Sequence, residues 1–244
     1  MIRFAASALA LLLFVSSSAA QETKALADQT IRLIRQAQNK DGTYGNSLID
    51  TSKVLSALTR SPRRYNELDG PFFRRAAEHL VDVSAPDLPP ASKVLALAGA
   101  ISRPLVEARN RALEDLLTDP RAYQSYEGLL ALRTVQNIDV ELKNWPWPSV
   151  EEGMPPETAV LVAPDPTSIA PPPTSEMENW TAWARSARLR GVTPKNLPDL
   201  PHIEEGNTLD ELLAALEITI VCHGLTEPAP STFSSPVVLS RAPA

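Results

Sequence analysis

One four-residue segment occurs twice in this chain, and its spacing constrains the fold more than any other feature. Residues 52–55 and 92–95 both read Ser-Lys-Val-Leu, so the two copies begin 40 residues apart. A period near 40 is typical of helical-hairpin repeats, in which each unit supplies two helices and buries its apolar face by stacking on its neighbours. The repeat therefore predicts an all-α fold of stacked hairpins.

Four helical hairpins follow from the apolar periodicity and from the Gly, Pro and Asp residues that punctuate it. Pro71 and Pro90 suit the first turn of a helix, because they lack only an N–H that has no partner there. The expected helix pairs are 23–38 with 48–59, 71–83 with 90–102, 104–118 with 123–136, and 176–190 with a last helix that contains 212–221. The first three hairpins then fall within residues 21–144, and the fourth falls within 176–225.

The two helices of each expected hairpin differ in how their charges are distributed. The first helix carries charges on one face, for example Arg32 and Arg35, whereas the second is apolar nearly all round, for example at 94–101 and 212–221. A one-sided helix belongs at a surface, and a helix that is apolar all round belongs in the interior. The pattern predicts an inner ring of apolar helices within an outer ring of amphipathic ones.

Residues 145–175 form a proline-rich insert between the third and fourth hairpins. The insert holds nine prolines, which favour extended backbone and disfavour regular helix, and the one short strand expected there is 158–162. An insert of this length without regular structure is usually either functional or disordered. The tail at residues 226–244 is rich in Pro, Ser and Ala and is expected to be mobile.

Residues 1–20 have the pattern of a secretory signal peptide. Arg3 supplies the positive charge, residues 5–15 form an apolar run of 11, and residues 18–20 offer a small-residue cleavage site. The run is too short to cross a bilayer as a helix, and charges interrupt every later apolar stretch. A secreted or periplasmic protein with no transmembrane segment is expected; an uncleaved anchor and a buried N-terminal helix are the alternatives.

The charge and the cysteine count exclude several classes of function. The formal net charge of −6 argues against a nucleic-acid partner, which needs a concentrated basic surface. Cys222 is the only cysteine, so an intramolecular disulfide is excluded. Cys222 and His223 could be a nucleophile and its base, but a buried thiol is favoured because Cys is among the most buried residue types. With only three histidines in the chain, neither a metal site nor a cofactor is expected.

Residues 38–45, Gln-Asn-Lys-Asp-Gly-Thr-Tyr-Gly, connect the first two expected helices. Together with the Asp-Thr pair at 50–51, this segment resembles the glutamine and aromatic repeat of the squalene and hopene cyclases and of the protein prenyltransferase beta subunits. The resemblance implies an α/α toroid, which six hairpins would close. Four hairpins make an incomplete toroid, either an open arc or a ring completed by the insert or by a partner.

The same resemblance implies that the segment is a structural clasp between hairpins. In the family, the glutamine and the aromatic residue fix one hairpin to the next, and the matching positions here are Gln38 and Tyr44. Asp41 and Gly42 are expected to turn the chain, and Gly45 permits a close turn.

The family's chemistry does not carry over to this chain. The cyclases need an Asp-x-Asp-Asp cluster, and complement-type toroids need Gly-Cys-Gly-Glu-Gln; neither string occurs. The prenyltransferases hold zinc with Asp, Cys and His, but Cys222 and His223 are helix neighbours that point about 100° apart and cannot easily share one metal. The resemblance therefore favours a protein without catalytic activity.

One group of charged side chains near the first two hairpins is a candidate edge for binding an anion or another ligand. Its members are Asp50, Arg60, Arg63, Arg64, Arg74 and Arg75. Arginines can hold phosphate or sulfate, although a solvated face and, for Asp50, a helix cap are the simpler interpretations. Asp41, Asp50, Glu67 and Asp69 could also supply paired carboxylates for acid and base catalysis, with turns and caps again as the simpler interpretation.

Two tryptophans of the insert are candidates for an aromatic contact. Trp145 and Trp147 alternate with prolines and present flat side chains on a stiff backbone. They could stack on a sugar or contact a partner, but pinning the insert to the protein's own surface is favoured. Trp180 and Trp183 follow in the fourth hairpin, and all four tryptophans are expected to share one cluster.

These observations favour an exported, non-catalytic binding or scaffold module for a lipid-like ligand or a protein partner, including a second copy of the chain. An enzyme acting on isoprenoids is an alternative that rests on the resemblance alone. A polysaccharide lyase with a carbohydrate ligand is another, because α/α toroids also host such enzymes. It would use charged groups near Arg60–Arg75.

Overall fold

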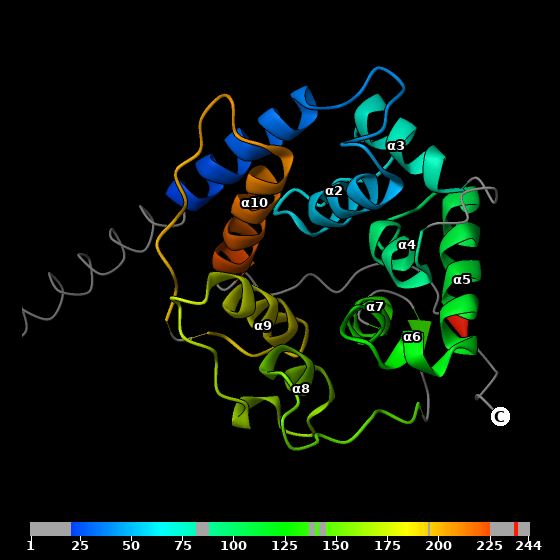
Figure 1. Ribbon diagram of the computed structural model, residues 1–244. Coiled ribbons are helices and arrows are strands. Elements are labelled where there is room, and N and C mark those ends of the chain that lie inside the picture. The colour runs from blue at the N-terminus through cyan, green and yellow to red at the C-terminus, as the bar shows by residue number, and fades with distance from the viewer. Residues whose placement is uncertain are drawn as a thin grey trace, which may run out of the picture.

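The computed structural model describes residues 21–81, 88–136, 140–141, 145–194, 196–224 and 237–238, which are mostly helical (Figure 1). The predicted all-α class is therefore confirmed for these residues, apart from one pair of two-residue strands. The expected signal peptide at residues 1–20 lies outside them. No helix of the described part is long and apolar enough to cross a membrane.

Most helix bounds lie within a few residues of those expected. Residues 21–36 form the first helix. The others are α2 (Leu48–Arg60), α3 (Pro71–Val81), α4 (Pro90–Ala96), α5 (Arg103–Thr118), α6 (Pro120–Gln124), α7 (Tyr126–Gln136), α8 (Pro156–Val162), α9 (Met177–Leu189) and α10 (Leu209–Gly224), with a 3-10 turn η1 at Pro166–Ser168. Two expected pairs do not pack closely: among the described helices, α3 packs on α2 and α5 and not mainly on α4, and α7 packs on α4, α6 and α8 and not mainly on α5.

Helix α4 is shorter than the sequence pattern predicts, since it ends at Ala96 and not near residue 102. The reason lies in Glu67, whose Oε1 accepts the backbone N–H groups of Ile101 and Ser102. These N–H groups are turned away from the helix, and Gly99 within the same stretch is a poor helix former. The hydrogen bonds to Glu67 instead hold the start of α5.

Helix α8 corrects the expectation of extended backbone in the insert and of a strand at 158–162. Its prolines bound the helix and do not interrupt it. Pro156 occupies the first turn, where a missing N–H costs nothing, and Glu157 suits the positive end of the helix dipole. Ala159, Val160, Leu161 and Val162 are buried, so tertiary packing decides the conformation of this short apolar run.

The helices form a continuous circuit of packed neighbours around a central region (Figure 1). Helix α2 packs on α4, α4 on α7, α7 on α8, α8 on α9, α9 on α10, and α10 returns to α2. Outside this circuit, α3 packs on α2 and α5, while α5 packs on α4 and α6. Residues 157 positions apart in sequence, Arg60 and Glu217, are thus brought together where α10 meets α2.

Helices α2 and α3 differ in how their buried residues are distributed. On α2 the buried residues are Thr51, Ser52 and Val54–Leu58. On α3 the buried side chains share one face and include Phe73 and Leu80. The largest core joins the first helix, α2, α3 and α10, and a second core lies among α4, α5 and α7.

The two short strands pair outside the helices. Strand β1 (Val140–Glu141) is parallel to β2 (Val237–Val238), with Val140 opposite Val237. The second strand belongs to the tail that was expected to be mobile, and it is anchored at this point. The other tail residues lie outside the described part of the chain.

Candidate functional site

The segment 38–45 has the geometry of a clasp. The side chain of Gln38 donates from Nε2 to the carbonyl of Gly42 and to the carbonyl of Phe72, both at 2.7 Å. Phe72 lies at the start of α3, so one amide ties the loop between the first helix and α2 to the next hairpin. Gln38 also forms an isolated antiparallel bridge with Tyr44.

The turn residues of the clasp are fixed by backbone geometry. Gly42 and Gly45 have φ values of 99° and 60°, a region that favours glycine. A Cβ at Gly45 would lie 2.6 Å from Oδ2 of Asp50, which itself accepts the N–H of Asn46 at 3.0 Å. Hydrogen bonds from Thr43 lower the pKa of Asp41. Asp41 and Asp50 are therefore both engaged in holding the turn.

Tyr44 is fully buried, and its hydroxyl has no hydrogen-bond partner among the described atoms. Burial raises the pKa of this phenol, so it stays protonated at physiological pH. Its backbone N–H donates to Oγ1 of Thr51 at 3.0 Å, which joins the loop to α2. Tyr44 thus packs within the core and presents no reactive group to solvent.

The members of the expected charged edge have different partners and different exposure in the structure. Asp50 lies in the first turn of α2 and Arg60 in its last turn. Arg63 is exposed and pairs with Asp28 at 2.9 Å, whereas Arg75 packs its Cβ toward Gly42. Arg64 and Arg74 are exposed. Arg60 differs from Arg63 in that its ion pair, with Glu217 of α10, is largely buried.

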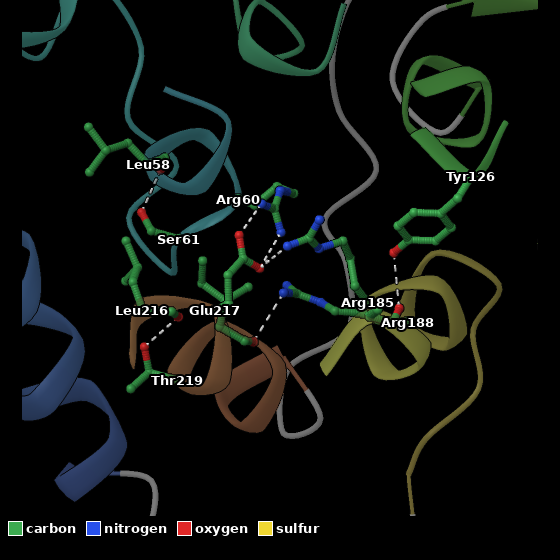
Figure 2. Close-up of polar contacts among 11 residues, drawn as sticks. Leu58, Arg60, Ser61, Tyr126, Arg185, Arg188, Leu216, Glu217 and Thr219 are labelled. Atoms are coloured by element: carbon green, nitrogen blue, oxygen red, sulfur yellow. Dashed lines mark hydrogen bonds and ion pairs between the residues drawn. The ribbon is translucent and has the colours of Figure 1, made fainter. Parts of the chain in front are cut away.

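Arg60 belongs to a buried ion-pair network that we call the central cluster: Arg60, Tyr126, Arg185, Arg188 and Glu217. Figure 2 shows Arg60 from α2 and Arg185 from α9 approaching the carboxylate of Glu217 on α10. Nη1 of Arg60 lies 2.7 Å from Oε2 of Glu217, its Nη2 bonds Oε1, and Nη2 of Arg185 lies 3.0 Å from Oε2. The carboxylate therefore joins three helices.

The central cluster is largely removed from solvent. The side chains of Arg60, Glu217 and Arg185 are 17%, 11% and 25% exposed. Burial alone would raise the pKa of Glu217, but the adjacent guanidiniums of Arg185 and Arg60 lower it to about 2. Glu217 is thus ionised throughout the physiological range and cannot act as a general acid.

Arg188 and Tyr126 complete the central cluster. Arg188 donates from Nη1 to the carbonyl of Ile220 at 3.1 Å, and the hydroxyl of Tyr126 donates to the carbonyl of Ala182 at 3.2 Å. Burial raises the pKa of Tyr126 despite the nearby arginines, so the phenol stays protonated. Burial and the neighbouring Arg60 lower the pKa of Arg188. The cluster therefore contains more cations than anions.

Sequence reasoning found only Arg60 among these residues. Glu217 could have revealed the cluster from the sequence, because it is the only charged residue between Leu212 and Cys222. A carboxylate inside a buried apolar helix requires a cationic partner. Arg185 and Arg188 were missed because α9 was interpreted through its apolar face, which includes Trp180 and Trp183.

The four carboxylates considered for acid and base catalysis all accept backbone N–H groups, as their simpler interpretation as turn and cap residues requires. Asp69 accepts the N–H of Asn66 at 2.7 Å, while Glu67 is buried against the start of α5. Backbone N–H groups of Ile101 and Ser102 lower the pKa of Glu67 in spite of its burial. Each carboxylate thus holds its own turn or helix start.

The tryptophans form two groups, which corrects the expectation of one cluster. Trp145 meets Tyr123 edge to face with ring centroids 5.3 Å apart. The guanidinium of Arg133 lies 3.4 Å from the ring centroid of Trp147. Trp180 and Trp183 pack in a separate core with Val160 and Val221. The two tryptophans of the insert therefore rest on α6 and α7.

Trp147 also borders a cavity of about 520 Å³, which residues of α7 and α8, the end of α9 and the insert line. Two arginines, Arg133 and Arg190, line the same cavity. Trp147, a candidate for an aromatic contact, thus lies beside Arg133 and Arg190, which the sequence analysis did not identify.

Cys222 is buried, and burial raises the pKa of its thiol to about 11, so it is not a nucleophile at neutral pH. The side chain of His223 lies outside the described residues. Among the residues that the structure describes, no three His, Cys, Asp or Glu side chains come together as a metal site.

Searches of protein-family models, of curated proteins and of solved structures returned no match for this chain.

Proposed function

We propose that this protein is an exported binding or scaffold module without catalytic activity of its own, which takes a lipid-like ligand or a protein partner. We further propose that its helical circuit is a small α/α toroid related to the cyclase and prenyltransferase repeats. The packing order of α2, α4, α7, α8, α9 and α10 supports this architecture. In this proposal the insert supplies α8 and completes the ring.

The observation that carries a binding role over a catalytic one is the state of Glu217. Its carboxylate is shared by Arg60 and Arg185, and the lowered pKa keeps it charged. A general base needs a pKa near the operating pH and access to a substrate proton. Glu217 has neither, so the central cluster acts as a lock between α2, α9 and α10.

A polysaccharide lyase is the second candidate, because Arg60, Arg185 and Tyr126 come near one another. Arginine could neutralise a sugar carboxylate, and tyrosine could move a proton. The pKa of Tyr126 is raised and its hydroxyl donates to Ala182, which disfavours its use as a base. An isoprenoid enzyme has no comparable group of residues in its favour.

Native mass spectrometry of the full chain, secreted from a host cell, tests the binding role. We expect a mature chain that begins at Gln21 and a mass increment from a bound ligand, a partner or a second copy. A bare monomer, with no ligand or partner recovered under any gentle purification, would contradict the proposal. Release of unsaturated sugars from an acidic polysaccharide, or turnover of a prenyl diphosphate or squalene, would replace it with an enzyme.

A further inference from the structure

The cavity beside Trp147 has a charged side and an apolar side. Arg133 of α7 and Arg190 at the end of α9 form the charged side. Trp147, Val150, Val162 and Pro164 supply the apolar side. A volume of about 520 Å³ is within the range of small-molecule sites.

The backbone of α8 holds both arginines in place. Nε of Arg133 and Nη1 of Arg190 donate to the same carbonyl, that of Leu161, at 2.8 and 3.2 Å. Nη2 of Arg190 donates to the carbonyl of Ala163 at 2.8 Å, and Nη1 of Arg133 to Oε1 of Gln136 at 2.9 Å. Two guanidiniums are thus anchored side by side on the last carbonyls of one helix.

These hydrogen bonds all go to neutral oxygens, so none of them neutralises the charge of the two arginines. Each guanidinium has five N–H donors and uses about two of them on these acceptors. Among the side chains that the structure describes, no carboxylate pairs with either arginine. Because both guanidiniums donate to the carbonyl of Leu161, two like charges lie close together; burial, and to a smaller extent the charge of Arg190, lower the pKa of Arg133 to about 10.

A purely structural role explains only part of this arrangement. One arginine at the end of α8 would satisfy its terminal carbonyls and interact favourably with the helix dipole. A second arginine bonded to the same carbonyl adds repulsion, which an anion between them would remove. The fork of a guanidinium fits a carboxylate or a phosphate with two parallel hydrogen bonds.

We propose that this cavity binds a small organic anion, with its carboxylate or phosphate group between Arg133 and Arg190 and its apolar body against Trp147 and Val150. The inference rests on the proposed binding role and gives it a site and a ligand class. The guanidinium of Arg133 makes a cation–π contact with the indole of Trp147, and this contact orients the cation toward the ligand.

Calorimetric titration tests the ligand class. The probes are 4-phenylbutyrate and phenyl phosphate, with 4-phenyl-1-butanol as the neutral control and inorganic phosphate as the control without an apolar body. We expect at least one organic anion to bind, and both controls to bind about tenfold more weakly or not at all. Preference between the two anions separates a carboxylate from a phosphate ligand.

Two kinds of variant assign the binding to this cavity. Arg190→Gln should weaken binding at least about tenfold, whereas Arg74→Gln, an exposed site on α3 that does not line the cavity, should not. Ser149 lines the cavity and is exposed, so Ser149→Glu would place a fixed carboxylate beside the arginines. We expect this variant to lose the probe and to melt at a higher temperature, while Ser149→Lys keeps the probe and melts lower.

The outcomes separate this inference from the proposed function. Absence of binding by both organic anions up to about 10 mM, or binding that Arg190→Gln and Ser149→Glu leave unchanged, overturns the inference. If Arg190→Gln fails to fold by circular dichroism, the Ser149 pair decides alone. If the protein binds neither probe but still has a bound partner in native mass spectrometry, the inference fails and the proposed function stands. If it binds neither probe and has no partner, both fail.

Discussion

The central cluster and the cavity beside Trp147 each hold two arginines close together, but they differ in what lies between the charges. At the centre, Arg60 and Arg185 share the carboxylate of Glu217. At the cavity, Arg133 and Arg190 share the carbonyl of Leu161. A carboxylate neutralises a guanidinium and locks helices together, whereas a carbonyl positions the guanidinium and leaves its charge available to a ligand.

Removal of the shared carboxylate is expected to have the largest effect. Glu217→Ala leaves two buried guanidiniums without a counter-ion, and breaking a buried pair from one side typically costs about 3–5 kcal/mol. Denaturation in urea should show a loss of this size in the free energy of unfolding. Glu107→Ala, which removes an exposed pair with Arg103, should leave stability almost unchanged. Equal effects of the two variants would mean that the central cluster is not a lock.

The pH dependence of stability should report the same carboxylate. Because the folded pKa of Glu217 is about 2 and its ordinary value is 4.5, its contribution is complete above pH 4.5 and is lost as pH falls toward 2. This contribution amounts to about 3 kcal/mol. The difference in unfolding free energy between wild type and Glu217→Gln should shrink over this window. A constant difference would contradict the lowered pKa.

Matched arginine substitutions compare the two regions directly. Arg60→Gln removes charged hydrogen bonds to Glu217 and should cost about 2–3 kcal/mol. Arg190→Gln also removes a source of repulsion on Arg133, so we expect a loss of about 1 kcal/mol or less. Urea denaturation of both variants at pH 7 measures the contrast. A greater loss for Arg190→Gln would reverse the assignment of lock and binding site.

The smallest expected effect concerns the aromatic wall of the cavity. Trp147→Leu keeps apolar contact but removes the ring beneath Arg133, which should lower the unfolding free energy by about 0.5–1 kcal/mol. Trp147→Phe keeps an aromatic ring beneath Arg133 and should lower the unfolding free energy by less than Trp147→Leu does. Thermal melts followed by circular dichroism would detect the order, and identical melting of all three proteins would show that the cation–π contact contributes nothing.

Much of the helical framework could be predicted because it depends on local patterns. The repeat at 52–55 and 92–95, the apolar periodicity and the prolines at helix starts placed seven helices within a few residues of their observed bounds. The turn at 38–45 was also interpretable, since its glycines and Asp41 have direct backbone roles.

The remaining features depend on contacts between distant segments, which one sequence does not display. Helix α8 forms because packing against α7 and α9 overrides the proline-rich context. The C-terminal end of α4 depends on Glu67, more than 30 residues away. The central cluster required knowing that α10 meets α2, and the cavity required knowing that α9 ends beside the insert.

The most direct test of the account follows the arginine side chains by NMR while 4-phenylbutyrate and then phenyl phosphate are added. Nε–H signals of Arg133 and Arg190, and the indole signal of Trp147, should shift and saturate with one of these probes. The Nε–H signals of Arg60 and Arg185 should stay unchanged, since their guanidinium groups are already paired with Glu217. Shifts confined to Arg60 and Arg185, or no shift at any of the four arginines, would contradict the division between a locked centre and a binding cavity.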